Sequence, residues 1–175
     1  TGPAELRVTR SDGTIVRRMS VPSAAGTHRV NWDLRHGGLE EPTEWERDGE
    51  EGFPTNRPPR AGGGVHVSPG QYTVTLVARG MESSKTMRVV GDPMLELSDD
   101  DYRATEAFLL RAGELGSRAA EAANDDSLSE AQRESLTGLV RRIRTLGRTY
   151  GDAGRFYDGN FGPPAASEIA ELEGL

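Results

Sequence analysis

The feature that most constrains the fold of this chain is a change in hydrophobic periodicity near residue 93. Before this point apolar and polar residues alternate, as in 6–9 (LRVT) and 71–78 (QYTVTLVA), which is the period of a half-buried β-strand. Beyond it, apolar residues recur every three or four positions, which is the period of an amphipathic helix. Asp92-Pro93 marks the change, since proline cannot donate a hydrogen bond to a strand ladder. The sequence therefore predicts a mixed fold, β first and then α.

Turn signals divide the β region into short strands. Ser-Asp-Gly at 11–13, Pro-Gly at 69–70 and Arg-Gly at 79–80 each favour a tight turn. Residues 28–35 (HRVNWDLR) alternate around a central tryptophan, which predicts a further strand. We therefore expect residues 1–93 to form a small antiparallel β-sandwich. Its predicted core residues are Trp32, Tyr72, Val74 and Leu76.

Two roles are open for Trp32. It lies between Val30 and Leu34 on one face of the predicted strand, which favours a place in the core of the sandwich. An exposed indole would instead offer a stacking platform for a sugar ring. We expect the core role and keep the sugar platform as the alternative.

A long polar insertion at 36–68 interrupts the strand pattern. It contains a Glu-rich stretch, two prolines at 58–59 and three glycines at 62–64. A structureless loop of this length is uncommon in a compact domain. Two interpretations stay open: a surface loop with incidental aromatic residues, or a segment that packs on a partner through Trp45 and Phe53.

Two capping signals begin helices within residues 94–147. Ser98 with Asp101, and Ser129 with Gln132, have the spacing of a capping box. An apolar stripe at helical spacing follows each signal. Two amphipathic helices joined by a short polar loop fold back on each other. The sequence therefore predicts an antiparallel helical hairpin.

Residues 148–175 form a tail that is rich in glycine and aromatic residues and ends in a short predicted helix from Ser167. The apolar face of that helix must dock on the helical pair or on another chain. Large apolar surfaces on a soluble chain mark interfaces, so we expect a partner to contact the insertion and the tail. The candidate interface residues are Trp45, Phe53, Tyr150, Phe156, Tyr157, Phe161, Ile169 and Leu172.

Charge and residue content argue against several classes of function. The net charge of −7 disfavours a general nucleic-acid-binding surface, and no apolar run is long enough to span a membrane. Cysteine is absent, and His28, His36 and His66 lack the spacing of a metal site. The acidic runs at 99–101 and 125–126 are explained by helix capping and a polar turn rather than by calcium, and no serine lies in a nucleophile elbow. We predict no catalytic residue, no metal site and no cofactor.

Four segments together resemble a recurrent bacterial domain. They are 12–17 (DGTIVR), 26–35 (GTHRVNWDLR), 69–74 (PGQYTV) and 89–93 (VVGDP). They are similar to the immunoglobulin-like or fibronectin-like sandwich at the C-terminal end of large exported β-propeller proteins with sortilin-like or sialidase-type (BNR) repeats. The first part also resembles the sandwich of flagellar hook-capping proteins. In the propeller family a helical hairpin follows the sandwich.

The resemblance implies an immunoglobulin/fibronectin III-like sandwich, a helical hairpin and a short C-terminal helix in an extracytoplasmic bacterial protein, periplasmic or secreted. The chain begins at Thr1 without a signal-peptide pattern, so we expect a piece of a longer protein. The expected function is a non-catalytic structural and protein-interaction module that braces its own propeller domain or docks it in a larger complex. The alternative is a carbohydrate-binding module that uses Trp32, Trp45 or Phe53. No catalytic residue carries over from the propeller to this chain.

Overall fold

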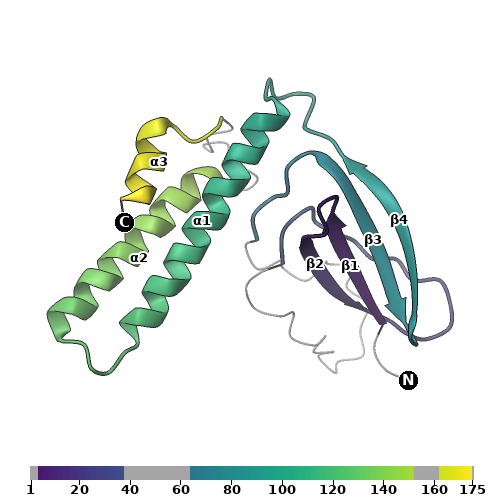
Figure 1. Cartoon of the computed structure of the whole chain (residues 1–175), viewed down its shortest axis with the longest axis horizontal. Coiled ribbons are helices and arrows are strands. Elements are labelled where there is room, and N and C mark those ends of the chain that lie inside the picture. Colours follow the sequence, from purple (N-terminus) through teal and green to yellow (C-terminus); the bar gives the residue numbers. More distant parts are fainter. Residues whose placement is uncertain (1–3, 38–63, 152–161, 175) are drawn as a thin grey trace, which may run out of the picture. The chain divides into compact units, whose positions relative to one another are not determined.

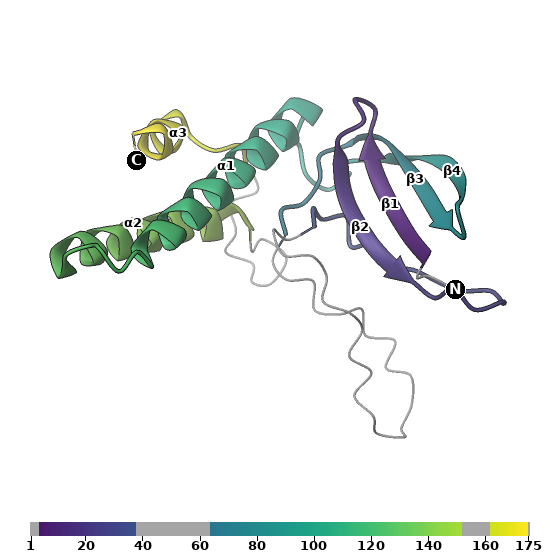
Figure 2. The same ribbon diagram turned by 60° about the horizontal axis from the view of Figure 1, so that its bottom comes forward.

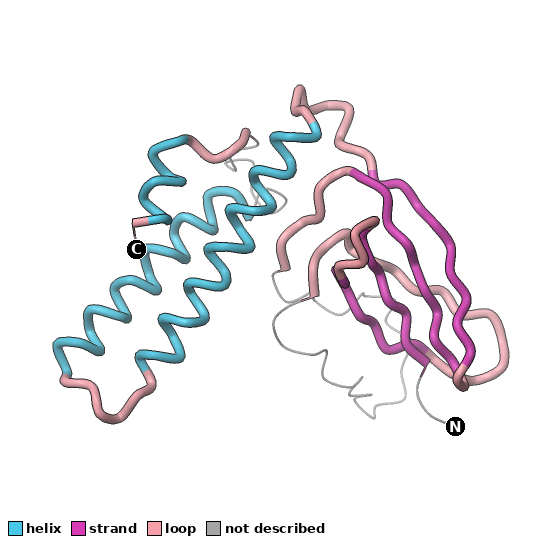
Figure 3. The backbone as a smooth tube through the Cα atoms, in the orientation of Figure 1, coloured by secondary structure: helices cyan, strands magenta, loops and turns pink. Residues whose placement is uncertain are grey.

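The computed structural model describes residues 4–37, 64–151 and 162–174 (Figure 1). They belong to two compact units, Thr1–Val90 and Gly91–Leu175. The first unit contains the strands β1 (Ala4–Arg10), β2 (Ile15–Val21), β3 (Gly70–Ala78) and β4 (Met81–Val89). The second contains the helices α1 (Asp99–Ala123), α2 (Glu130–Gly151) and α3 (Ala166–Glu173). Strands precede helices along the chain, which confirms the predicted mixed fold (Figure 3).

The four strands form one antiparallel sheet in the order β2-β1-β3-β4 (Figure 2). The β1–β2 hairpin turns at Gly13, whose φ of 86° is accessible to glycine without strain. The β3–β4 hairpin turns at Arg79 and Gly80, both with positive φ, as a two-residue type I′ turn requires. Both turns lie where the sequence predicts them. Within the described residues the sheet is a single open layer and no second sheet is seen.

The two faces of the sheet differ in polarity because side chains alternate along each strand. In β1, Ala4, Leu6 and Val8 lie on one face, whereas Glu5, Arg7 and Thr9 lie on the other. Cross-strand partners share a face, so the register continues both sets across the sheet. We call the two sides the apolar face and the polar face. The apolar face carries Leu6, Val8, Met19, Val21, Tyr72, Val74, Leu76, Met81, Met87 and Val89.

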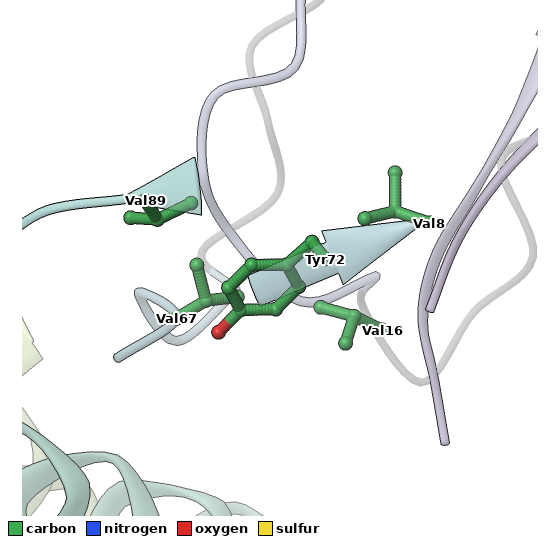
Figure 4. Close-up of a cluster of buried hydrophobic side chains, with 5 residues drawn as sticks. All are labelled: Val8, Val16, Val67, Tyr72 and Val89. Atoms are coloured by element: carbon green, nitrogen blue, oxygen red, sulfur yellow. The ribbon is translucent and has the colours of Figure 1, made fainter. Parts of the chain in front are cut away.

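Tyr72 lies at the centre of the core of the first unit, with only 2% of its surface exposed. Figure 4 shows its ring among four buried valines, and its hydroxyl donates a hydrogen bond to the Ser68 carbonyl oxygen at 2.6 Å. Trp32 and Val74 are partly buried and pack against this cluster. Leu76, predicted for the core, is instead 40% exposed, although it lies on the same face as Tyr72 and Val74. The four valines are Val8, Val16, Val67 and Val89.

The strand predicted at 28–35 does not form. Its only ladder contact is an isolated bridge between Arg35 and His66. Leu34 has a φ of 58°, which breaks the extended backbone, and the Asp33 carboxylate accepts a hydrogen bond from the Arg35 N–H at 3.2 Å. This local turn competes with a strand ladder. Val30 and Leu34, predicted to share a buried face with Trp32, are therefore exposed.

Both predicted capping boxes are present in the helical unit. The Ser98 side chain accepts from the Asp101 N–H, and the Asp101 carboxylate accepts from the Ser98 N–H. Ser129 and Gln132 make the same reciprocal pair ahead of α2. Helices α1 and α2 are in contact. The hairpin is therefore confirmed, although α2 continues to Gly151 rather than ending near residue 147.

The short helix α3 docks on the helical pair of its own unit. Leu172 is only 3% exposed, and the Arg142 guanidinium of α2 forms an ion pair with the Glu171 carboxylate of α3 at 2.7 Å. The sequence left two partners possible for this helix, the helical pair or another chain, and in the structure it contacts the helical pair. The tail predicted to begin at residue 148 thus divides into the last turn of α2, the segment outside the described residues, and α3.

Replacing Tyr72 with alanine is expected to lower the free energy of unfolding of the first unit by about 3–5 kcal/mol, because a large buried ring is removed. Leu76→Ala, on the same face of the same strand, is expected to cost less, about 1–2 kcal/mol, since its side chain is 40% exposed. Denaturant unfolding followed by tryptophan fluorescence measures both, because both tryptophans lie in this unit. Equal losses for the two variants would contradict this description of the core.

Candidate functional site

Part of the apolar face, next to the Tyr72 cluster, presents an apolar patch. Leu6 lies opposite Met19 on one side and Leu76 on the other, so the three side chains form one row across three strands. Met81 starts β4 in the next row and is 70% exposed. We call Leu6, Met19, Leu76 and Met81 the open patch; Leu76 and Met81 are exposed, whereas Leu6 and Met19 are partly buried against the core cluster. Methionine adapts to irregular partner surfaces, which suits such a patch to binding another protein.

The opposite face of the sheet, the polar face, carries hydroxyl and charged side chains. The Thr75 hydroxyl lies 2.8 Å from the Ser84 hydroxyl, and the Glu5 carboxylate pairs with Arg7 at 3.2 Å and with Arg18 at 3.8 Å. These ion pairs are exposed, so they add little to stability. The contrast between the two faces makes the open patch, rather than the polar face, the candidate interaction surface of the first unit.

A short stem closes the polar insertion at its base. We define the stem as residues 34–37 and 64–67, two extended segments that run antiparallel. The His36 N–H donates to the Val65 carbonyl at 2.8 Å, and the Val67 N–H donates to the Leu34 carbonyl at 2.9 Å. Gly64 permits the two backbones to approach closely, because a Cβ at this position would overlap the His36 carbonyl oxygen. The stem therefore fixes the two ends of the insertion beside each other.

Arginine side chains tie the stem to its surroundings. Arg17 of β2 donates to the His36 carbonyl at 2.9 Å, and Arg35 donates to the Gly64 carbonyl at 2.6 Å. The Arg17 Nε and one Asp33 carboxylate oxygen are buried without a hydrogen-bond partner among the described residues. Burial, and then the positive charge of Arg35, lower the pKa of His66 below its ordinary value of 6.5. His66 is thus held neutral near pH 7.

The candidate interface residues predicted from sequence fall into three groups. Those of the insertion and most of the aromatic tail lie outside the described residues, and so does the side chain of Tyr150, which belongs to α2. Ile169 of α3 is exposed, whereas Leu172 is buried within its own unit and is not available to another chain. The residues outside the described part are Trp45, Phe53, Phe156, Tyr157 and Phe161.

Sequence reasoning missed the open patch. Alternation places Leu76 and Met81 on the apolar face, but it does not say how far the covering segments reach along that face. The exposure of Leu76 depends on which residues pack against that face, and Trp32, which packs beside Tyr72, is separated from β3 by the insertion. No local pattern marks this outcome.

Neither a metal-ion cluster nor a membrane-spanning helix is found among the described residues. Among them, no group of three or more His, Asp or Glu side chains is arranged to hold a metal ion. None of the described helices combines the length and apolar character that a membrane span requires. Ionisable side chains gather most closely at the stem, where backbone carbonyls already accept hydrogen bonds from the two arginines.

Comparisons of the chain with protein-family models, curated proteins and solved structures give no match. Function is therefore inferred from the geometry of the residues described above.

Substituting Gly64 by alanine is expected to lower the stability of the first unit by roughly 1–3 kcal/mol, because the new Cβ would overlap the His36 carbonyl oxygen and push the stem apart. Gly37→Ala is the matched control at the same stem. Its Cβ would meet only ordinary van der Waals neighbours, Arg17 Cδ at 3.7 Å and the Val16 carbonyl at 3.9 Å. Thermal unfolding of the two variants separates the cases, and a Gly37→Ala loss as large as that of Gly64→Ala would argue against the stem geometry.

Stability of the first unit is expected to fall as the pH drops below 6.5. The unfolded chain protonates His66 near its ordinary pKa of 6.5, whereas the folded chain resists protonation until a lower pH, so acid favours the unfolded state. His66→Gln is expected to flatten this dependence between pH 6.5 and the lowered pKa. The wild-type chain, measured in parallel, is the reference. Denaturant midpoints measured across pH 5 to 7.5 test both expectations. If stability depends on pH in His66→Gln as steeply as in the wild type, His66 is not the source of the dependence.

Proposed function

We propose that this chain is a non-catalytic protein-interaction module of a larger exported protein, and that its β unit docks on its own propeller domain through the open patch. The observation that carries the proposal is the exposure of Leu76 and Met81 on the apolar face of the sheet. The resemblance of segments 26–35 and 69–74 to the propeller-associated sandwich supports this partner and an extracytoplasmic location.

A one-sided sheet needs a second layer. A sheet that is apolar on one face becomes stable when another element covers that face. In this chain Trp32 and Val67 pack at the Tyr72 cluster, whereas Leu76 and Met81 stay exposed on the same face of the sheet. We propose that the partner supplies the missing part of the layer. The complete arrangement would then be the immunoglobulin/fibronectin III-like sandwich that the sequence suggests.

The helical unit is the weaker candidate for the main interface. Its short helix α3 is tied to α2 by the Arg142–Glu171 ion pair, and Leu172 is buried. The apolar face that the sequence left without a partner is thus partly covered within the unit. Leu110 and Ile169 remain exposed, but single exposed apolar residues are common on protein surfaces.

Carbohydrate binding is less well supported by the geometry. The Trp32 indole N–H donates to the Arg35 carbonyl at 2.9 Å, and its ring stands edge-on to Tyr72, with centroids 5.5 Å apart. These contacts favour a structural role for a residue that would otherwise be the natural stacking platform for a sugar. The other two aromatic residues considered for this role, Trp45 and Phe53, lie outside the described residues.

Leu76→Arg is expected to weaken binding to the propeller part of the parent protein at least tenfold, because a charge would enter an apolar contact and stay without a partner. Thr73→Arg, on the polar face of the same strand, is the matched control and is expected to change the affinity less than twofold. Isothermal titration calorimetry of the two separately produced parts measures both. Absence of binding by the wild-type chain, or equal losses for the two variants, would refute the proposal.

A further inference from the structure

The outer edge of β4 is a second candidate surface, which shares only Met81 with the open patch. Strand β4 ends the sheet, and all of its residues except Val89 are exposed. The other end of the sheet is different, because the Gly37 N–H of the stem donates to the Val16 carbonyl of β2 at 2.9 Å. Among the described residues, the backbone of β4 is paired only with β3. A free edge of this length is a template for pairing with another strand.

The sequence of β4, MESSKTMRV, is largely complementary to itself when two copies run antiparallel about Lys85. A two-fold axis through Lys85, perpendicular to the sheet, keeps the apolar face of both copies on the same side. In this register Glu82 lies opposite Arg88 of the second copy, and Met81 lies opposite Val89. Each pair occurs twice. Opposite charges and apolar side chains that face each other across strands stabilise such a pairing.

Lys85 is the exception in this register. It lies opposite Lys85 of the second copy, and like charges directly across a strand pair are unfavourable. It is the only lysine in the chain. It lies on the apolar face, opposite Val74 of β3, and it is the middle residue of β4. Lysine at the centre of an edge strand is a recurrent way to discourage pairing between sheets.

We propose that the β4 edge is a self-complementary interface for a second copy of this chain, and that the charge of Lys85 keeps this interface weak. Neutralising this charge, or pairing it with an anion, joins two sheets into one continuous eight-stranded sheet. A shift of the register by two residues, centred on Ser84, is a poorer alternative. It places Glu82 opposite Thr86 and so loses both cross-strand ion pairs.

The test measures self-association of the full chain by sedimentation equilibrium. Lys85→Thr is expected to tighten self-association at least tenfold relative to the wild type, because it replaces a like-charge pair with two β-branched residues. Arg88→Thr removes the same charge from the same strand and is the matched control. It is expected to give no tightening, since it also removes the partner of Glu82. Lys85→Gln, which is neutral without adding a β-branched residue, checks that charge is the cause, and circular dichroism shows that each variant is folded.

Two further variants test the register. In the Lys85→Thr background, Glu82→Arg is expected to abolish the gain, because arginines would then face each other across the strands. Adding Arg88→Glu to that double variant is expected to restore the gain by exchanging the charges of the pair. The proposal is overturned if Lys85→Thr and Lys85→Gln associate no more tightly than the wild type, or if Glu82→Arg leaves the gain intact. None of these variants changes a residue of the open patch, so failure of this proposal is distinguishable from failure of binding through that patch.

Discussion

Tyr72 joins the separate parts of the β unit through one side chain. It belongs to β3, its ring contacts valines of β1 and β2 and the edge of the Trp32 ring, and its hydroxyl bonds to the Ser68 carbonyl. Removing this ring would therefore disturb the sheet and its covering segments together. The open patch adjoins the Tyr72 cluster through Leu6 and Met19, while Leu76 and Met81 stay exposed.

The two exposed features of the sheet have different physical characters. The open patch is apolar and adaptable, and burying it removes hydrocarbon surface from water without requiring a defined hydrogen-bond register. The β4 edge offers backbone groups in a fixed register, so its partner must match residue by residue. The stem adds a third element: through Gly64 and two arginines it holds the ends of the insertion at a set position beside β2.

Much of the local structure is predictable from short stretches of sequence. The turns at Gly13 and Gly80 follow from glycine's access to positive φ, and the capping boxes at Ser98 and Ser129 follow from a three-residue spacing. The hairpin α1–α2 follows from two apolar stripes joined by a short loop. Each of these features depends on groups that are close in sequence, so a pattern is enough to find it.

The sequence alone determined that this chain has a β part with one apolar face, followed by paired helices, because strand and helix periods are local properties. Tertiary structure decided that residues 28–35 turn instead of pairing, that Leu76 is exposed and that Leu172 is buried within its own unit. Each of these outcomes depends on what packs against the residue from elsewhere in the chain. Alternation predicts on which face of the strand a side chain lies. Burial depends on which residues from elsewhere in the chain pack against that face, as Trp32 and Val67 do at Tyr72.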